Sequence, residues 1–375
     1  MTPRKVIIVC KEFYPSLTPR AFRAAELAAE LGKRGHEVKV YIPSWNGKGE
    51  GAGLETFARQ RGFTLSGLGR KGWPEVQLRG RGLALLARRA VRRLLSLLFE
   101  YPDIWLMFRI RKLLRAEQGH DLLVSIAVPH PVHWGVAWAR TRKTPIASTW
   151  VADCGDPYMG CRTDSFRKPF YFKYLEKWFG RKADFISIPF EGAREGYYPE
   201  FHHKIRVIPQ GFSLEGLDLP DFRKTAGHPV FGYAGGFIPG YRDPGPLLEF
   251  LVTWEHPFKF VIYSMNSGML EPYMDRLNGS LEVREYIPRE ELLKELSLMD
   301  FLLNFDNNTG VQLPSKLIDY SLTGRPVLNI TAPFREGPLR EFLQGDYSGR
   351  MELPSREQYD IRKVANQFLD LCKAS

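Results

Sequence analysis

The sequence predicts an α/β protein built from two doubly wound domains that face each other across a cleft. Two observations predict this class. Short, continuous apolar runs alternate with helical patterns along the chain, which is typical of parallel sheets with helical crossovers. The alternation stops after Gly211 and restarts at Val230, and 375 residues exceed what one core organises comfortably.

The first domain is predicted over residues 1–212. It begins with an apolar run at 6–10, followed by a helix over 21–33 and a second strand at 38–42. Its other expected strands are 122–126, 146–150, 185–188 and 206–208. Each run is short and apolar, as buried strands are.

A second domain is predicted over residues 229–355, after a polar, turn-rich linker at 213–228. Its expected strands are 230–233, 258–263, 281–284, 301–305 and 327–330. The remaining segment, 356–375, carries apolar residues on one stripe, which predicts a C-terminal helix. The stripe consists of Ile361, Val364, Phe368 and Leu371.

Bulk properties restrict the class of protein. No apolar run reaches the 18 residues of a membrane span, and the N-terminal run of five is too short for a signal peptide. Four cysteines do not make a disulfide framework, so we expect reduced thiols in a cytoplasmic protein. The net charge of +11 indicates anionic partners: nucleic acid, anionic lipid or phosphorylated ligands.

Basic residues gather in the segment 79–115, where ten Arg and Lys face two acids. At 100° per residue, five arginines share an arc of about 140° and the leucines occupy the other side. The arginines are Arg81, Arg88, Arg89, Arg92 and Arg93. This pattern suits an anionic membrane surface, and it equally suits a core-packed helix with a solvated basic face. Nucleic acid is a weaker third option, because no recognition motif accompanies the charge.

The stretch GVQLPSKLIDYSLTGRPVLNI, residues 310–330, combines phosphate-binding and ribose-binding features. Pro314, Ser315 and Lys316 begin a helix, whose unpaired N–H groups and positive dipole end attract a diphosphate. Lys316 adds a full charge, and Asp319 follows about one turn later. A carboxylate can accept both hydroxyls of a ribose. The alternative is an ordinary capped helix start.

A glycine-rich stretch, VFGYAGGFIPGYRDPGPLLEFL, spans residues 230–251. Gly235 and Gly236 let the backbone approach a ligand closely, although a structural turn also explains two glycines. Arg242 follows, and an arginine can bind phosphate oxygens in bidentate fashion. The pattern therefore predicts a second phosphate-binding element.

These stretches resemble the donor site of retaining GT-B glycosyltransferases, the large family 4 group. DFLLNFDNNTGVQLPSKLIDYSLTGRPVLNI (300–330) is similar to the donor-sugar strand, loop and helix of that family. VIPQGF (207–212) resembles the segment that ends its acceptor domain, and DCGDPY (153–158) resembles the D-F-R-D-P-W loop of a subgroup that builds surface polysaccharides. The resemblance implies the GT-B fold, with a C-terminal helix that can cross back to the N-terminal domain.

The resemblance also implies a function. The family transfers a sugar from a nucleotide-diphosphate donor, with retention of configuration, to a lipid-linked or polysaccharide acceptor in cell-surface glycan synthesis. No metal and no cofactor are expected, because Arg242 and Lys316 would stabilise the departing diphosphate. The implied donor-binding residues are Gly235, Gly236, Gln312, Ser315 and Asp319. The expected location is cytoplasmic and peripheral, at an anionic inner membrane face bound through 79–115, with no nucleic acid partner.

Three positions depart from the family pattern. Val311 replaces the first of two glutamates, so that Gln312, Asn307, Asn308 or backbone amides would contact the sugar instead. Arg242 stands where the family usually has a lysine. Val151 replaces a histidine of the acceptor domain, and Asp153 lies two residues further on.

The acceptor-side candidates follow the first domain's strands. Asp153 is expected to be catalytic and Asp156 to contact the acceptor, although Asp156-Pro157 is also a common turn. Arg20 or Arg23 could meet an anionic acceptor, or could simply be a surface residue. His130 or His133, after a strand end, could line the acceptor pocket.

Two rival functions stay open. A nucleotide-sugar epimerase or hydrolase would use the same fold without an acceptor. A catalytically silent relative would bind membrane or partner proteins through 79–115, a reading that Val311 supports. An NAD-dependent oxidoreductase is disfavoured, because no G-x-G-x-x-G follows either first strand. The nucleotide base, the sugar, the acceptor and the oligomeric state are left open.

Overall fold

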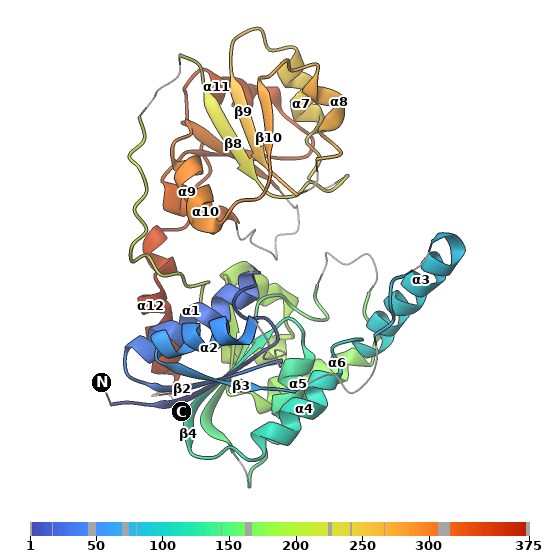
Figure 1. Ribbon diagram of the computed structural model, residues 1–375, viewed down its shortest axis with the longest axis vertical. Coiled ribbons are helices and arrows are strands. Elements are labelled where there is room, and N and C mark those ends of the chain that lie inside the picture. Colours follow the sequence, from blue (N-terminus) through green and yellow to red (C-terminus); the bar gives the residue numbers. More distant parts are fainter. Residues whose placement is uncertain are drawn as a thin grey trace. The chain divides into compact units, whose positions relative to one another are not determined.

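The computed structural model of the chain forms two compact units, Met1–Ser213 with Gln358–Ser375, and Leu214–Glu357 (Figure 1). We call them the first and the second unit. The predicted fold class, α/β with two parallel-sheet domains, is confirmed. The structure describes residues 2–16, 18–43, 50–69, 75–79, 81–143, 145–161, 167–223, 227–240, 242–265, 267–306 and 316–372.

The first unit contains a seven-stranded parallel sheet in the order β3-β2-β1-β4-β5-β6-β7. The strands are β1 (Lys5–Cys10), β2 (Glu37–Ile42), β3 (Phe63–Gly67), β4 (His120–Ala127), β5 (Ala147–Cys154), β6 (Phe185–Ile188) and β7 (Ile205–Val207). Ile8 pairs with Val40 on one side and Val124 on the other. The strand order reverses between β1 and β4, and ligands of such sheets bind at the carboxyl ends of the strands flanking this point.

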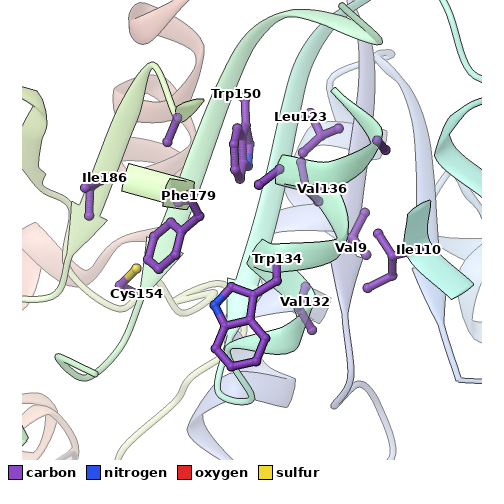
Figure 2. Close-up of a cluster of buried hydrophobic side chains, with 14 of the residues drawn as sticks. Val9, Ile110, Leu123, Val132, Trp134, Val136, Trp150, Cys154, Phe179 and Ile186 are labelled. Carbon is purple, nitrogen blue, oxygen red and sulfur yellow. The ribbon is translucent and has the colours of Figure 1, made fainter. Parts of the chain in front are cut away.

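Helices cover both faces of this sheet. They are α1 (Pro19–Lys33), α2 (Glu50–Gln60), α4 (Trp105–Leu114), α5 (Pro131–Ala139), α6 (Phe172–Lys182) and α12 (Ile361–Leu371). The unit also contains α3 (Gly82–Phe99), which has no buried residue. Figure 2 shows the core beneath α5, where Trp134, Trp150 and Phe179 fill the space beside the strands. On the other face, α1 and α12 share a core with β1 and β2.

The last helix, α12, therefore belongs to the first unit. Its apolar stripe, which includes Val364 and Phe368, is buried in the core shared with α1. The backbone N–H of Phe212 donates to the carbonyl of Tyr359 (2.8 Å), and that of Ile361 donates to the carbonyl of Phe212 (2.9 Å). Both chain connections to the second unit thus leave the first unit side by side.

The second unit contains a five-stranded parallel sheet in the order β10-β9-β8-β11-β12. The strands are β8 (Val230–Ala234), β9 (Lys259–Tyr263), β10 (Leu281–Arg284), β11 (Phe301–Phe305) and β12 (Val327–Ile330). The helices are α7 (Gly245–Val252), α8 (Glu271–Met274), α9 (Arg289–Ser297), α10 (Lys316–Thr323) and α11 (Glu336–Leu343). Phe231 stacks on Phe260 and Phe301 at 4.7 Å, so one ring from each of three adjacent strands builds the core. The order reverses between β8 and β11.

Two strands differ most from the sequence-based expectation, and several others differ by one or two residues at their ends. β3 was not predicted, because it is an edge strand in which only Phe63 is buried. β5 runs on to Cys154, so Asp153 lies in a strand and not in a loop. The extension forms because Asp153 pairs with Ile126 on β4 and Ser187 on β6, which keeps this end of β5 inside the sheet.

In the described part of the chain, no helix is long and apolar enough to cross a bilayer.

Candidate functional site

The glycine turn after β8 has a conformation that requires glycine. Gly235 has φ +151°, and a Cβ there would lie 2.9 Å from the Tyr233 hydroxyl. The Gly235 N–H donates to the carbonyl of Tyr263 (3.0 Å), and the Tyr233 hydroxyl donates to the carbonyl of Gly236 (3.0 Å). The turn is therefore fixed directly over the Tyr233 ring at the carboxyl end of β8.

Arg242 returns to this turn through a short antiparallel bridge. Its N–H donates to the carbonyl of Ile238 (2.9 Å) and its own carbonyl accepts from Ile238 (3.2 Å). Burial raises the pKa of Tyr233 to about 12, against the opposing charge and hydrogen bond of Arg242. The Nε of Arg242 is buried and has no hydrogen-bond partner among the described residues.

Lys316, the first residue of α10, brings a second cation to the same ring. Its Nζ lies 4.3 Å from the centroid of Tyr233, and it too is buried without a described partner. Burial, followed by the charge of Arg242, holds the pKa of Lys316 well below its ordinary value. Buried cations without an acid are costly, so this arrangement suits an anion.

Asp319 lies one turn along α10 and pairs with a residue that the sequence did not single out. Its Oδ1 accepts a hydrogen bond from Nε of Arg289 (2.8 Å), the first residue of α9, and lies 2.6 Å from Nη2 of the same guanidinium as an ion pair. Burial raises the pKa of Asp319, and Arg289 opposes the rise. Both contacts reach Oδ1, and no described residue bonds Oδ2. The signal for Arg289 was a cation in the first turn of a helix, where the dipole disfavours it.

A pocket lies close to the pair formed by Asp319 and Arg289. Tyr286 is close enough for Asp319 to raise its pKa, burial being the larger cause, and it also lines a cavity of about 620 Å³. Ser264 and Glu285 line the same cavity, at the carboxyl ends of β9 and β10. The second unit thus carries a cation pair, a carboxylate and a cavity along one edge of its sheet. Gln312 and Ser315, with Asn307, Asn308 and Val311, lie outside the described residues.

In the first unit, the acceptor-side candidates gather at the carboxyl ends of β1, β4 and β5. The guanidinium of Arg20 occupies the space where a Cβ on Gly155 would lie, and Asp156 follows in the same bend. The charge of Arg20 acts on both His130 and Asp153. Arg20, His130 and Asp156 therefore belong to one neighbourhood, which we call the acceptor-side cluster.

His130 is only 4% exposed, and its ring lies 4.4 Å from that of Tyr158. Its Nε2 is buried without a partner in the described part of the chain. Burial, then the charges of His133, Lys168 and Arg20, holds its pKa well below the ordinary value. His130 is therefore a neutral imidazole at pH 7.

His133 is a core histidine. Its Nδ1 bonds Ser125 Oγ (2.8 Å) and its Nε2 lies 3.3 Å from Cys154 Sγ. Ser125 Oγ in turn accepts from Trp150 Nε1 (2.8 Å). Burial lowers the pKa of His133 to about 3. Of the two histidines, only His130 keeps a nitrogen without a described partner.

Asp153 is bound inside the first unit and is 3% exposed. Its Oδ1 accepts from Arg23 Nη2 (2.8 Å) and Ser187 Oγ (2.7 Å), and its Oδ2 accepts from Arg23 Nε (3.1 Å). Burial alone would raise the pKa of Asp153, but the charge and bonds of Arg23 outweigh it and lower the pKa. The predicted catalytic role of Asp153 stays a prediction; the geometry is that of an internal anchor.

Arg23 is consequently not available to an acceptor, and that expectation is corrected. It is 2% exposed and lies over the ring of Phe368 on α12, at 4.9 Å. Its guanidinium also donates to the carbonyls of Ile208 (3.1 Å) and Pro209. One side chain thus joins α1, β5, α12 and the segment that leads out of the first unit.

Residues 21–211, just over half of the chain, match the family model described as "Glycosyl transferase 4-like domain". The chain belongs to the glycosyl transferase 4-like family. The match lies in the first unit and includes His130 and Asp156 but not Arg20. No curated protein matches this family member in sequence.

Solved glycosyltransferases share the fold of this family member over their full lengths. A glycosyltransferase from Rickettsia africae is 9% identical, with 100% of this chain and 99% of that chain covered and a TM-score of 0.61. Anabaena Alr3699/HepE in complex with UDP-glucose is 9% identical, with 99% and 100% covered and a TM-score of 0.61. The lipopolysaccharide outer core galactosyltransferase WaaB is 12% identical, with 99% of both chains covered and a TM-score of 0.59. At these identities the likeness establishes the fold alone.

Breaking the Asp153–Arg23 pair should destabilise the first unit. Asp153→Ala leaves Arg23 buried and unpaired, so we expect a loss of about 3–5 kcal/mol in the free energy of unfolding, measured by urea denaturation. The double variant Arg23→Met with Asp153→Leu removes both charges and should lose less than Asp153→Ala alone. Equal unfolding midpoints for Asp153→Ala and the wild type would contradict this assignment.

Proposed function

We propose that this chain transfers a sugar from a nucleotide-diphosphate donor, with retention of configuration, to a lipid-linked or polysaccharide acceptor in cell-surface glycan synthesis. The observation that carries the proposal is the cation pair of Arg242 and Lys316 around Tyr233. Arg242 Nε and Lys316 Nζ are both buried and have no hydrogen-bond partner among the described residues. The oxygens of a diphosphate would supply these partners.

The donor would extend along the edge of the second unit's sheet. The diphosphate would lie over the turn at Gly235 and Gly236, between Arg242 and Lys316. The ribose would meet the unoccupied Oδ2 of Asp319, whose orientation Arg289 fixes. The cavity beside Tyr286 has room for a nucleobase. That the Anabaena protein of the same fold is in complex with UDP-glucose supports this class of donor.

The leaving group would be stabilised without a metal ion. As the bond between sugar and diphosphate breaks, negative charge accumulates on the diphosphate oxygens. Arg242 can bind these oxygens with a fixed fork of donors, and Lys316 places a point charge beside them. Both are positioned before the reaction, Arg242 by its bridge to Ile238 and Lys316 by α10.

The acceptor would bind in the first unit, at the acceptor-side cluster. Arg20 would meet an anionic group such as the diphosphate of a lipid-linked glycan, and the neutral His130 and Asp156 would bond its sugar hydroxyls. Asp153 would support the acceptor site indirectly. Its bonds to Arg23 hold α1 in place, and Arg20 lies one turn before Arg23 on that helix. The fold shared with a lipopolysaccharide galactosyltransferase supports a glycan acceptor.

We further propose that the enzyme works in the cytoplasm, peripherally at an anionic membrane face, with the segment 79–115 as the contact. A lipid-linked acceptor would be reached at that surface. The charge of this segment, ten cations against two acids, supports this location.

Removing one cation should weaken donor binding. Arg242→Ala or Lys316→Ala should lower the affinity for the preferred nucleotide sugar by about 5- to 150-fold. This corresponds to about 1–3 kcal/mol for a polar group left without its partner. A thermal-shift panel of UDP- and GDP-sugars identifies the ligand, and calorimetry measures the affinity. Arg335→Ala, an exposed arginine of the same unit, is the matched control. If no nucleotide sugar binds the wild type, the proposal fails in favour of a silent relative.

Donor binding should also take up a proton. The pKa of Lys316 is low in the free protein and a bound diphosphate raises it, so between these two values the affinity should fall as pH rises. At a pH between these two values, the calorimetric enthalpy should therefore depend on the ionisation enthalpy of the buffer. Lys316→Met should remove this dependence. A wild-type enthalpy that is the same in all buffers would argue against a diphosphate at Lys316.

The reaction class has its own test. With the preferred donor and a lipid-linked glycan fraction, proton NMR of the product should show the anomeric configuration of the donor, and a chelator should leave the rate unchanged. Release of free sugar or isomerised donor as the sole product would instead identify a hydrolase or an epimerase. An inverted product would refute retention while leaving sugar transfer intact.

A further inference from the structure

Helix α3 lies outside the core of the first unit. None of its residues is buried, and Leu83 is 85% exposed. Leu86, Val91 and Leu94, on the same face, are also exposed. In Figure 1 the helix extends away from the sheet of its unit. The core-packed alternative is therefore wrong for α3, although α4, in the same segment 79–115, does pack into the core. Among the described residues, no core covers the leucine face of α3.

The opposite face of α3 is strongly cationic. Arg88, Arg89, Arg92 and Arg93 lie there, and the residues 79–99 contain no acid. Arg88 also donates to the carbonyl of Arg79, which fixes the approach to the helix. Arginine side chains are long enough to reach from this face towards the edges of the leucine stripe, so cations and leucines can meet a single anionic and apolar boundary together.

The helix is anchored at its C-terminal end. Glu100, in the left-handed conformation with φ 53°, ends α3 and accepts from Tyr158 (3.0 Å) and Lys168. The Tyr171 hydroxyl donates to the carbonyl of Leu98. Since Lys168 neutralises Glu100, the nearest acid does not offset the arginines. The anchored end fixes α3 next to the start of α6.

Aromatic side chains continue the apolar surface at this end. Phe170 is 71% exposed, and Phe99 and Tyr174 are exposed as well. The Nζ of Lys173 lies 5.0 Å from the ring of Tyr174. Exposed aromatic rings beside cations are typical of the headgroup boundary of a bilayer.

We propose that α3 and the residues 170–174 form one docking surface for an anionic bilayer. The helix lies in the plane of the membrane, with Leu83, Leu86 and Leu94 at the acyl boundary. The arginines contact lipid phosphates, and the rings of Phe170 and Tyr174 insert into the headgroup region beside them. This inference deepens the membrane contact proposed above, and lipid binding itself does not require sugar transfer.

Other occupants fit the surface less well. Packing two copies leucine to leucine would bring two sets of arginines together with no acid between them. Nucleic acid would satisfy the arginines but leave the leucines and Phe170 in water. An anionic bilayer matches both the charge and the apolar face.

The test is sedimentation of the full chain with vesicles of phosphatidylcholine, alone or mixed with phosphatidylglycerol. Binding is expected with the mixed vesicles only. Arg88→Gln with Arg92→Gln should weaken it about 25-fold, at about fivefold per cation near the surface. Leu83→Gln with Leu94→Gln, which keeps the charge, should abolish retention at raised salt. Arg335→Gln with Arg350→Gln removes the same charge from exposed sites of the second unit and should have no effect.

All substituted side chains lie outside the core, so each variant should fold, and an unchanged melting temperature verifies this. The proposal is overturned if the wild type stays in solution with mixed vesicles, or if the leucine variant binds them like the control. It is also overturned if sedimentation velocity shows dimers that the leucine variant abolishes. Donor binding by the vesicle-negative variants should be normal, so failure here and failure of the proposed reaction are separable.

Discussion

Arg242 and Lys316 approach the ring of Tyr233 from two segments that are more than seventy residues apart, and neither meets a described carboxylate. Burial, and then the charge of Arg242, lowers the pKa of Lys316, so holding both charges at this position destabilises the free protein. The glycine turn over the same ring adds a backbone conformation that only glycine adopts easily. Two unfavourable features, unpaired buried cations and a strained backbone turn, therefore occur together at the carboxyl edge of this sheet. An anionic ligand bound there would balance the charge.

In the first unit, by contrast, the buried charges of Asp153 and Arg23 are paired with each other. Asp153 and Arg23 satisfy one another completely, with Ser187 and two backbone carbonyls taking the remaining positions. Such a pair adds rigidity more than net stability, because desolvation consumes most of the attraction. Its effect is to fix α1 against β5 and the segment leaving the unit. A charged group at a strand end can therefore be a ligand site or an anchor, and the presence of an opposite charge distinguishes the two.

That distinction explains what the sequence could and could not predict. Buried parallel strands appear as apolar runs, so 185–188, 281–284, 301–305 and 327–330 were predicted to the residue. β3 lacks such a run because one face is open. Asp153 looked like a loop residue because its partner, Arg23, is 130 positions away. Arg289 escaped notice for the same reason: its pairing with Asp319 depends on how α9 packs beside α10. Sequence patterns indicate which segments are buried, whereas predicting which charged residues pair requires knowing how the helices and strands are arranged in space.

Helix α3 extends this reasoning to the surface. Its periodicity predicted an amphipathic helix but did not identify what the apolar stripe packs against, because a core and a bilayer select the same stripe. None of its residues is buried, which decides against the core. Tyr158 then links the helix to the proposed chemistry. Its ring contacts that of His130 at a centroid distance of 4.4 Å, and its hydroxyl donates to Glu100, which ends α3. One buried ring thus joins the acceptor-side cluster to the anchored end of the docking surface, so a bilayer that orients α3 also orients the groups proposed to receive a lipid-linked acceptor.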